Sequence, residues 1–299
     1  MSRLYSNEYI ETRLKEEFDI NPSTIKLIGS GYDSEAYLID NAYIFKFAKH
    51  KLASKDYMRE KRILDFLKAN LKTNIQIPII EYFRNSNDIA IMGYKVINGT
   101  FLSPKIYERM NKIQKEKLVQ SLSVFLKSLH SLDTEEIIEY TNDNRKGCIE
   151  DLELLQTRIY NMLTEKEKKF VESIFNQIFN NNKIFNGTKC LCHNDFSCNH
   201  ILLNDNYELV GIIDFGDACI TDEYCDFLYL LEESDEEIGR DFGLEILKCY
   251  NFMDIETVIE YANLKEEYYP IETILCGIKN DSKELFDEGL KLLKERANE

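Results

Sequence analysis

Residues 201–213, ILLNDNYELVGII, have the pattern of a tight β-hairpin, because two apolar runs flank an Asn-Asp-Asn turn. In an antiparallel hairpin the second strand returns the chain to the point where the first strand began. The run CHNDFSCNH stands directly before this hairpin, and the run IIDFGD closes it. We therefore expect three ionisable side chains to lie close together at one end of the hairpin: Asp195, His200 and Asp214.

Aspartate and histidine at these positions suit the catalytic loop and the metal site of a phosphoryl-transfer enzyme. Asp195 would accept a proton from a substrate hydroxyl or orient that hydroxyl. Asp214 ends an apolar strand, where it would bind Mg²⁺ across the phosphates of a nucleotide, with His200 as a second ligand. Mg²⁺ prefers oxygen ligands, which favours the metal role of Asp214 over that of His200.

The same stretch can be interpreted as a zinc site. Its candidate ligands are Cys190, Cys192, His193, Cys198 and His200. Closed zinc sites usually contain a C-x2-4-C element, whereas the spacing here is C-x-C. Buried free cysteines explain the apolar KCLCH run equally well, and a zinc site leaves Asp195 and Asp214 without a role. We favour the phosphoryl-transfer interpretation.

The first part of the chain is rich in strands and the remainder is mainly helical. The expected elements are a helix at 6–18, three short strands within 23–50, a helix at 54–71, strands at 77–83 and 88–97, and helices at 115–132, 149–183 and after 214. Apolar residues repeat at three and four along 115–132, which predicts one buried face. The pattern predicts an α+β fold with a small antiparallel-sheet lobe at 1–93, a connecting strand at 94–98, and a larger lobe at 99–299 with a helical segment at about 136–185.

Two charged residues of the first lobe are candidates for phosphate binding. Lys46 lies between apolar neighbours in YIFKFAKH, so its strand should be at least half buried. Glu60 in the next helix would hold Lys46 against the phosphates, which is the ion pair that protein kinases use. Gly29 and Gly31 stand in a turn where the backbone could approach a phosphate. Solvated surface charge remains the alternative for Lys46 and Glu60, and G-x-G-x-x-G is incomplete because Ser34 replaces its third glycine.

The composition limits the partners of this chain. Its formal net charge of −16 would repel a phosphate backbone, so we expect no nucleic-acid partner. No apolar stretch approaches the roughly 20 residues of a membrane span, and the first residues lack the pattern of a signal peptide. We therefore expect a cytoplasmic protein without membrane contact, a monomer, whose eight cysteines are reduced thiols.

Residues 222–237 contain eight carboxylates and no lysine or arginine. A helix there would place four side chains on one face: Tyr229, Glu232, Glu233 and Glu236. Like charges at helical spacing oppose helix formation by about a few tenths of a kcal/mol per pair. This cost indicates that the face binds a polycation, and we expect Asp217, Glu266 and Glu267 to line the same cleft. Simple solubility is the alternative explanation of the acidic surface.

Taken in order, the GSG turn, Lys46, Glu60, HNDFSCNH and IIDFGD resemble the aminoglycoside phosphotransferases, which share the protein-kinase fold. The run CHNDFSCNHILL…GIIDFGD…DEYCDFLYLLEESDEEIG and the run EEYYPIETI resemble the 2''-O-phosphotransferases in particular. The resemblance covers nearly the whole chain and implies a bilobal protein-kinase-like fold. Two positions depart from the wider kinase pattern. Asn194 replaces an arginine or glycine, and His200 replaces a metal-binding asparagine.

This resemblance implies Mg²⁺-dependent transfer of the γ-phosphoryl group of a nucleoside triphosphate to the 2''-hydroxyl of an aminoglycoside antibiotic, which confers resistance. It implies a catalytic Asp195 and a metal bound by His200 and Asp214. We expect the nucleotide to be bound by Ser30, Gly31, Lys46, Glu60, Tyr94 and Ile97. We expect the acceptor to be bound by Ser197, Asp217, Tyr229, Glu232, Glu236 and Glu266, to which the acidic face adds Glu233. A tyrosine at position 94 resembles the GTP-preferring members, so we expect GTP to be favoured over ATP.

Three other functions remain open at this level. A kinase for another amine metabolite, such as choline, is the nearest, although several carboxylates favour an acceptor with several ammonium groups. A protein kinase is less favoured, because no A-P-E element follows DFG. A non-catalytic kinase-like binding protein would not need to keep Lys46, Asp195 and Asp214 together.

Overall fold

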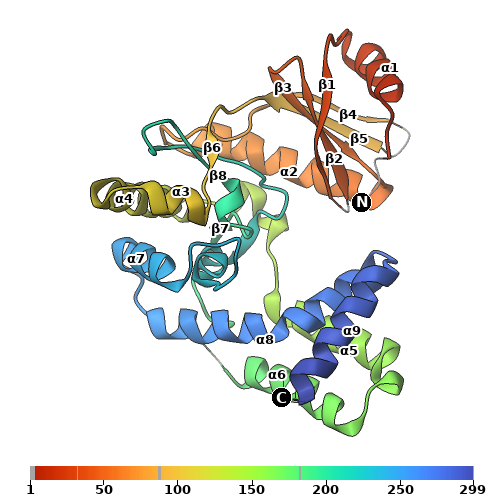
Figure 1. Cartoon of the computed structure of the whole chain (residues 1–299), viewed down its shortest axis with the longest axis vertical. Helices are drawn as coiled ribbons and strands as arrows, with labels where there is room; N and C mark the ends of the chain where they lie inside the picture. The colour runs from red at the N-terminus through yellow and green to blue at the C-terminus, as the bar shows by residue number, and fades with distance from the viewer. Residues whose placement is uncertain (1–3, 32, 87–88, 182, 299) are drawn as a thin grey trace.

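The computed structural model describes residues 4–31, 33–86, 89–181 and 183–298. The chain has an α+β fold, in which a five-stranded antiparallel sheet is followed by a mostly helical region (Figure 1). This order of elements confirms the fold class expected from the sequence.

The N-terminal sheet has the strand order β1-β2-β3-β5-β4, and each pair of neighbours is antiparallel. Its strands are β1 (Ile25–Ser30), β2 (Ser34–Ile39), β3 (Tyr43–Ala48), β4 (Ile80–Ser86) and β5 (Ile89–Lys95). These are the five strands that the sequence predicts; Asp88, the first residue of the last predicted strand, lies outside the described residues. Strand β3 is central, and its residues 45–48 are buried on both faces.

The two faces of β3 have different roles because successive side chains of a strand point in opposite directions. Phe45 and Phe47 are buried in an apolar cluster with helix α1 (Asn7–Phe18). Lys46 points to the other face, where helix α2 (Lys51–Asn70) packs. The alternation of aromatic and charged residues in YIFKFAKH therefore turns a lysine toward α2.

The chain leaves the N-terminal sheet after β5 and enters a small second sheet. Strand β6 (Thr100–Phe101) pairs with β8 (Ile201–Leu203), which pairs with β9 (Leu209–Ile212). Strands β8 and β9 are antiparallel and confirm the predicted hairpin. Gly99 permits the close approach of the two segments, because a Cβ at this position would lie 3.0 Å from Leu202 Cβ.

The core of the C-terminal region is built around helix α4 (Lys112–His130). Its five predicted apolar residues are buried: Leu118, Leu122, Phe125, Leu126 and Leu129. An Asn111 side chain caps the helix and forms a capping box with Gln114. The same core includes residues of β7 (Lys189–Cys192) and of helix α7 (Arg240–Tyr250). A short helix, α3 (Pro104–Arg109), precedes α4.

A further group of helices has an apolar cluster of its own (Figure 1). It consists of α5 (Asn144–Arg158), α6 (Glu165–Asn180), α8 (Ile255–Lys279) and α9 (Lys283–Asn298). The helical pattern predicted over 149–183 is thus divided between α5 and α6. Within the described ranges, the structure contains no helix whose length and apolar character would suffice to cross a bilayer.

Two expectations about the segment after residue 214 are wrong. Residues 219–222 form strand β10 (Cys219–Asp222), which pairs with β7, whereas the sequence predicts helices there. The predicted acidic helix over 229–236 is a single 3₁₀ turn (Tyr229–Leu231), after which residues 232–239 are irregular. The repulsion between like charges at helical spacing is avoided, because the backbone that carries them is not helical.

The close packing of α9 on α8 leads to a stability prediction. A Cβ at Gly289 would lie 2.6 Å from Ile274 N and 2.9 Å from Pro270 O, and these backbone atoms cannot rotate away. Gly289→Ala should therefore lower the free energy of unfolding by about 1–3 kcal/mol, measured by urea denaturation. Gly147→Ala in α5 is the control, since a Cβ there has no atom within 4 Å; it should be neutral or stabilise by up to about 1 kcal/mol. Equal losses in both variants would contradict this account.

Candidate active site

A buried lysine connects the N-terminal sheet to the C-terminal region. Lys46 Nζ lies 3.3 Å from Glu60 Oε2 in α2 and 3.1 Å from Asp214 Oδ1, which follows β9. The lysine is 8% exposed and Glu60 is 2% exposed. Burial alone would lower the pKa of Lys46, but Glu60 and Asp214 raise this pKa well above its ordinary value. The ammonium is therefore charged, and solvated surface charge is excluded for both Lys46 and Glu60.

Asp214 occupies a special backbone position directly after the β8–β9 hairpin. Its φ of 64° lies in the left-handed region, which aspartate tolerates better than most residues. The Lys46 ammonium lowers the pKa of the Asp214 carboxyl to about 2. Asp214 is therefore ionised throughout the neutral range.

His200 lies between the two aspartates that the hairpin was expected to bring together. Its Nδ1 lies 3.5 Å from Asp195 Oδ2, and its Nε2 lies 3.9 Å from Asp214 Oδ2. A single imidazole ring thus separates the two carboxylates. The sequence-based expectation that Asp195, His200 and Asp214 meet at one end of the hairpin is confirmed.

The hydrogen bonds of His200 decide which ring nitrogen is available to a metal ion. Nδ1 lies 2.8 Å from the main-chain oxygen of Asp195. A carbonyl oxygen can only accept, so Nδ1 carries the proton and the neutral ring keeps a free lone pair on Nε2. That nitrogen is the one nearest to Asp214. An ionised carboxylate and an unprotonated imidazole nitrogen on facing side chains are a donor set that fits a divalent cation.

The loop that carries Asp195 is held through its backbone by a buried carboxylate, Asp226. Asp226 accepts hydrogen bonds from His193 N at 3.0 Å and from Asn194 N at 2.6 Å. His130 Nε2 of α4 lies 2.9 Å from the same carboxylate. Asn194 has a φ of 65°, in the left-handed region that asparagine tolerates. Asp226 and His130 were not predicted as functional residues; the available signal was a carboxylate between the apolar residues Cys225 and Phe227.

Two other acids of the 222–237 run also have partners inside the fold. Asp222 is fully buried and forms an ion pair with Lys189 at 2.8 Å. Glu237 accepts from Cys198 N through both carboxylate oxygens, at 3.1 and 3.3 Å. Asp222, Asp226 and Glu237, which were not among the predicted acceptor residues, thus bind the loop and its neighbouring strands.

Besides Lys46 and Glu60, the predicted nucleotide contacts lie at the end of β1 and directly after it, and at the end of β5 and just beyond it. Lys49, which the sequence analysis missed, donates to Gly31 O at 2.6 Å and to Ser30 Oγ at 3.0 Å. A Cβ at Gly31 would meet no atom within 4 Å, so this backbone is open on the side where a side chain would stand. Tyr94 is 8% exposed at the end of β5, and Ile97 follows in the irregular segment that leads to β6.

The zinc interpretation fails on geometry. In the described part of the chain, the side chains that meet closely enough to bind a metal in a group of three are His130, Cys190 and Cys192. Both ring nitrogens of His130 are already hydrogen-bonded, to Tyr250 and to Asp226. The five ligands proposed from the sequence are not assembled around one point, and all eight cysteines are free thiols.

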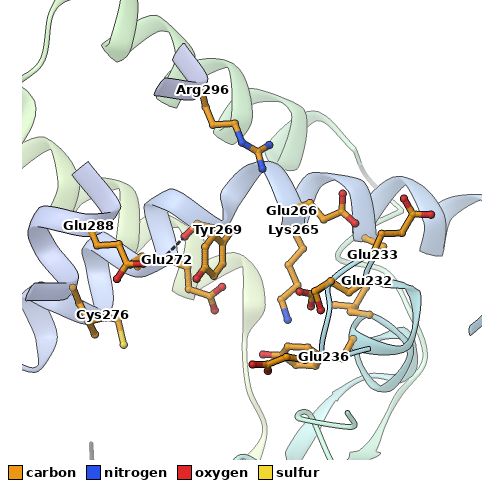
Figure 2. Close-up of a pocket in the computed structure, with 16 residues that line it drawn as sticks. Glu232, Glu233, Glu236, Lys265, Glu266, Tyr269, Glu272, Cys276, Glu288 and Arg296 are labelled. Carbon is orange, nitrogen blue, oxygen red and sulfur yellow. Dashed lines mark hydrogen bonds between the residues drawn. The ribbon is translucent and has the colours of Figure 1, made fainter. Parts of the chain in front are cut away.

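An acidic pocket of about 790 Å³ lies between helices α8 and α9 and the segment around Tyr229 (Figure 2). Its lining includes one lysine, Lys265, one arginine, Arg296, and six glutamates: Glu232, Glu233, Glu236, Glu266, Glu272 and Glu288. Five predicted acceptor residues line this pocket: Tyr229, Glu232, Glu233, Glu236 and Glu266. As expected, Glu266 comes from a distant segment, whereas the other four come from a backbone that is not the predicted helix.

The remaining predicted acceptor residues lie outside the pocket lining. Ser197 Oγ contacts Asn199 Oδ1 at 2.5 Å and His200 Nδ1 at 3.2 Å, within the Asp195 loop. Desolvation and the charge of Asp195 raise the pKa of the Asp217 carboxyl. Glu267 lines a different surface hollow, next to Gln177 and Asn180, so its predicted place in the acidic cleft is wrong.

Tyr229 lines the acidic pocket and also lies in the electrostatic field of the Asp195 carboxylate. Desolvation is the first cause that raises the pKa of its hydroxyl, and the charges of Asp195, Glu272 and Asp217 follow. The ring thus stands within the electrostatic range of carboxylates from both sites. A cationic molecule in the pocket would lie in the combined field of these groups.

Comparisons with known proteins agree with this geometry. Residues 24–261 match the phosphotransferase enzyme family. The gentamicin complex of APH(2'')-IIa is similar at 30% identity with a TM-score of 0.86, over 98% of this chain and 97% of that chain. The ternary complex of the same protein with streptomycin and ATP is 29% identical with a TM-score of 0.84, over 98% and 97%. A GDP and kanamycin complex of APH(2'')-IIia, 24% identical with a TM-score of 0.85 over 98% and 99%, shares the fold.

Glu237 gives the protein a pH-dependent stability that glutamine would remove. Desolvation raises the pKa of Glu237 from its ordinary value of 4.5 to about 7. Between these values the unfolded chain releases the proton and the folded chain keeps it, so stability falls as pH rises and the cost is complete above pH 7. Glu237→Gln retains an acceptor for Cys198 N. Its stability relative to wild type should therefore rise by about 2–3 kcal/mol from pH 5 to pH 8, measured by denaturant unfolding. Parallel pH profiles would contradict the assignment.

Proposed function

The chain belongs to the phosphotransferase enzyme family, and we propose that it transfers the γ-phosphoryl group of a nucleoside triphosphate to the 2''-hydroxyl of an aminoglycoside antibiotic. One observation carries this proposal: Asp195 and Asp214 face each other across His200, and the charge of Asp195 acts on Tyr229 in the lining of a pocket with six glutamates. This arrangement supports phosphate chemistry beside a pocket that binds a polycation. Such an activity would confer resistance to the antibiotic.

The charge of the pocket supports a polycationic acceptor over a monocation such as choline. Glu232, Glu233 and Glu236 have no cationic side chain within 4.0 Å in the described residues, so their charge is available to a ligand. One ammonium group would neutralise only part of this charge, whereas an aminoglycoside carries several. The two similar complexes of APH(2'')-IIa contain gentamicin and streptomycin, which supports the same class of acceptor here.

In the proposed reaction Asp195 orients the acceptor hydroxyl and receives its proton. Its position is fixed because Asp226 holds the loop backbone at residues 193 and 194. Lys46 presents a permanent positive charge to the phosphate oxygens. Mg²⁺, when bound by Asp214 and His200, would neutralise charge on the phosphates.

The identity of the donor rests on Tyr94. This residue is buried at the end of β5, where the chain passes from the sheet to the helical region. A large rigid ring at this point restricts the space for a purine base, and we propose that it favours GTP over ATP. The similar structures contain ATP in one case and GDP in another. We further propose that the chain acts as a cytoplasmic monomer, where nucleoside triphosphates and the antibiotic are both present.

The direct test is identification of the product. The protein is incubated with GTP or ATP, Mg²⁺ and gentamicin or kanamycin, and the mass and the phosphorylated position of the product are determined. We expect addition of one phosphoryl group at the 2''-hydroxyl.

Asp195→Asn should reduce kcat at least about a hundredfold with little change in nucleotide affinity. Asp205→Asn, in the exposed turn at the far end of the same hairpin, should keep full activity. A product from choline alone, or undiminished turnover by Asp195→Asn, would refute the proposal.

The donor preference is tested separately by substitution of Tyr94. We expect wild type to have the higher kcat/KM with GTP. Tyr94→Met replaces the rigid ring with a flexible side chain and should reduce the GTP/ATP ratio of kcat/KM about tenfold, which corresponds to about 1.4 kcal/mol. Tyr160→Met, in the helical region away from β5, is the control and should leave the ratio as it is. An unchanged ratio in Tyr94→Met would remove Tyr94 as the determinant.

A further inference from the structure

The acidic pocket already contains a positive charge from the protein itself. Lys265 Nζ lies 3.4 Å from the centroid of the Tyr229 ring, which is well inside the roughly 6 Å limit of a cation–π contact. Among the described residues no carboxylate lies within 4.0 Å of this ammonium, although six glutamates line the pocket. Figure 2 shows Lys265 extending from α8 toward the segment that carries Glu232 and Glu236.

The face of Tyr229 is also a favourable place for an ammonium group of a ligand. An aromatic face attracts a cation, and the negative charges of Asp195, Glu272 and Asp217 act on this tyrosine. An acceptor whose hydroxyl is presented to Asp195 would bring its amines close to the same ring. The Lys265 ammonium and an ammonium group of the acceptor would therefore occupy the same site on the Tyr229 ring. They cannot bind there together, because two positive charges at one ring face repel each other.

Arg240, a cation that contacts the pocket residue Glu266 but does not itself line the pocket, is in a different situation. Arg240 Nη2 lies 3.6 Å from Glu266 Oε1 and donates to Asn263 at 2.8 Å. These contacts hold the guanidinium against α8. Among the described residues Lys265 contacts the ring face and forms no ion pair, and its flexible four-carbon chain can withdraw when a ligand arrives.

We propose that Lys265 is a tethered competitor of the acceptor: its ammonium occupies the face of Tyr229 and must be displaced before a polyamine binds there. Lys265 thereby sets the affinity of the pocket for cationic acceptors. This inference rests on the proposed function, since it assigns a specificity-determining residue to the same acceptor pocket.

The test separates acceptor affinity from turnover. Lys265→Met removes the charge and keeps the length of the side chain. We expect KM for kanamycin or gentamicin to fall about threefold to tenfold, as displacement of a cation–π contact implies, with the change in KM and not in kcat. Titration calorimetry of the acceptor in the absence of nucleotide should give a matching fall in Kd. Lys265→Arg keeps a cation that stacks on an aromatic ring and should retain the wild-type KM.

A matched control excludes a general effect of net charge. Lys291→Met removes one positive charge from α9, where Lys291 contacts Glu295 on the helix surface. It should leave KM as in wild type. Equal falls in KM for Lys265→Met and Lys291→Met would reduce the effect to long-range attraction and overturn the inference. An unchanged KM in Lys265→Met would also overturn the inference. A raised KM would overturn it too, because Lys265 would then assist acceptor binding.

Failure of this inference is distinguishable from failure of the proposed function. If wild type phosphorylates no aminoglycoside and gives no binding heat with one, the proposed function is refuted. If wild type phosphorylates an aminoglycoside and Lys265→Met has the same KM and Kd, only the role of Lys265 is refuted.

Discussion

The candidate active site depends on the compensation of one buried charge. Lys46 loses most of its hydration on strand β3, and carboxylates from two other segments replace it: Glu60 of α2 and Asp214 after β9. Removal of one partner from such a group leaves an uncompensated charge, which costs more than the ion pair itself contributes. The N-terminal sheet and the C-terminal region are therefore joined at the point where phosphate chemistry is expected. The ammonium that would bind phosphate also positions the carboxylate that would bind the metal.

A second buried charge gives the Asp195 loop its shape. Asp226 accepts from two consecutive backbone N–H groups, and this arrangement is possible because Asn194 adopts a left-handed conformation. Asp226 holds the loop through its main chain. The Asp195 side chain is therefore not needed to hold the loop in place, and its carboxylate lies beside His200. Rigid support combined with a free functional group is what proton transfer at a fixed position requires.

The features that could be predicted from the sequence are those in which neighbouring residues in the chain determine the arrangement of the backbone. The hairpin brings Asp195 and Asp214 together because its two strands and its turn are contiguous in the chain. The pairing of β7 with β10 and the contact between His130 and Asp226 could not be predicted, since they join segments far apart in sequence. The predicted acidic helix at 229–236 failed for a physical reason that the sequence itself contains. Repeated like charges at helical spacing disfavour a helix, and the chain adopts an irregular backbone instead.

The acidic residues of the 222–237 run form two groups: those with a hydrogen-bond or ion-pair partner within the protein, and those without one in the described residues. Asp222 is paired with Lys189, and Asp226 is hydrogen-bonded to His130 and to two backbone N–H groups, so both carboxylates have partners within the protein. The glutamates of the pocket lining remain largely without such partners, and their mutual repulsion is a cost that a bound cation relieves. A pocket with this surplus of negative charge attracts any mobile cation within reach, including one from its own wall. The position of the Lys265 ammonium on the Tyr229 ring follows from that attraction, because the ring face places it among several carboxylates without an ion pair to any that the structure describes.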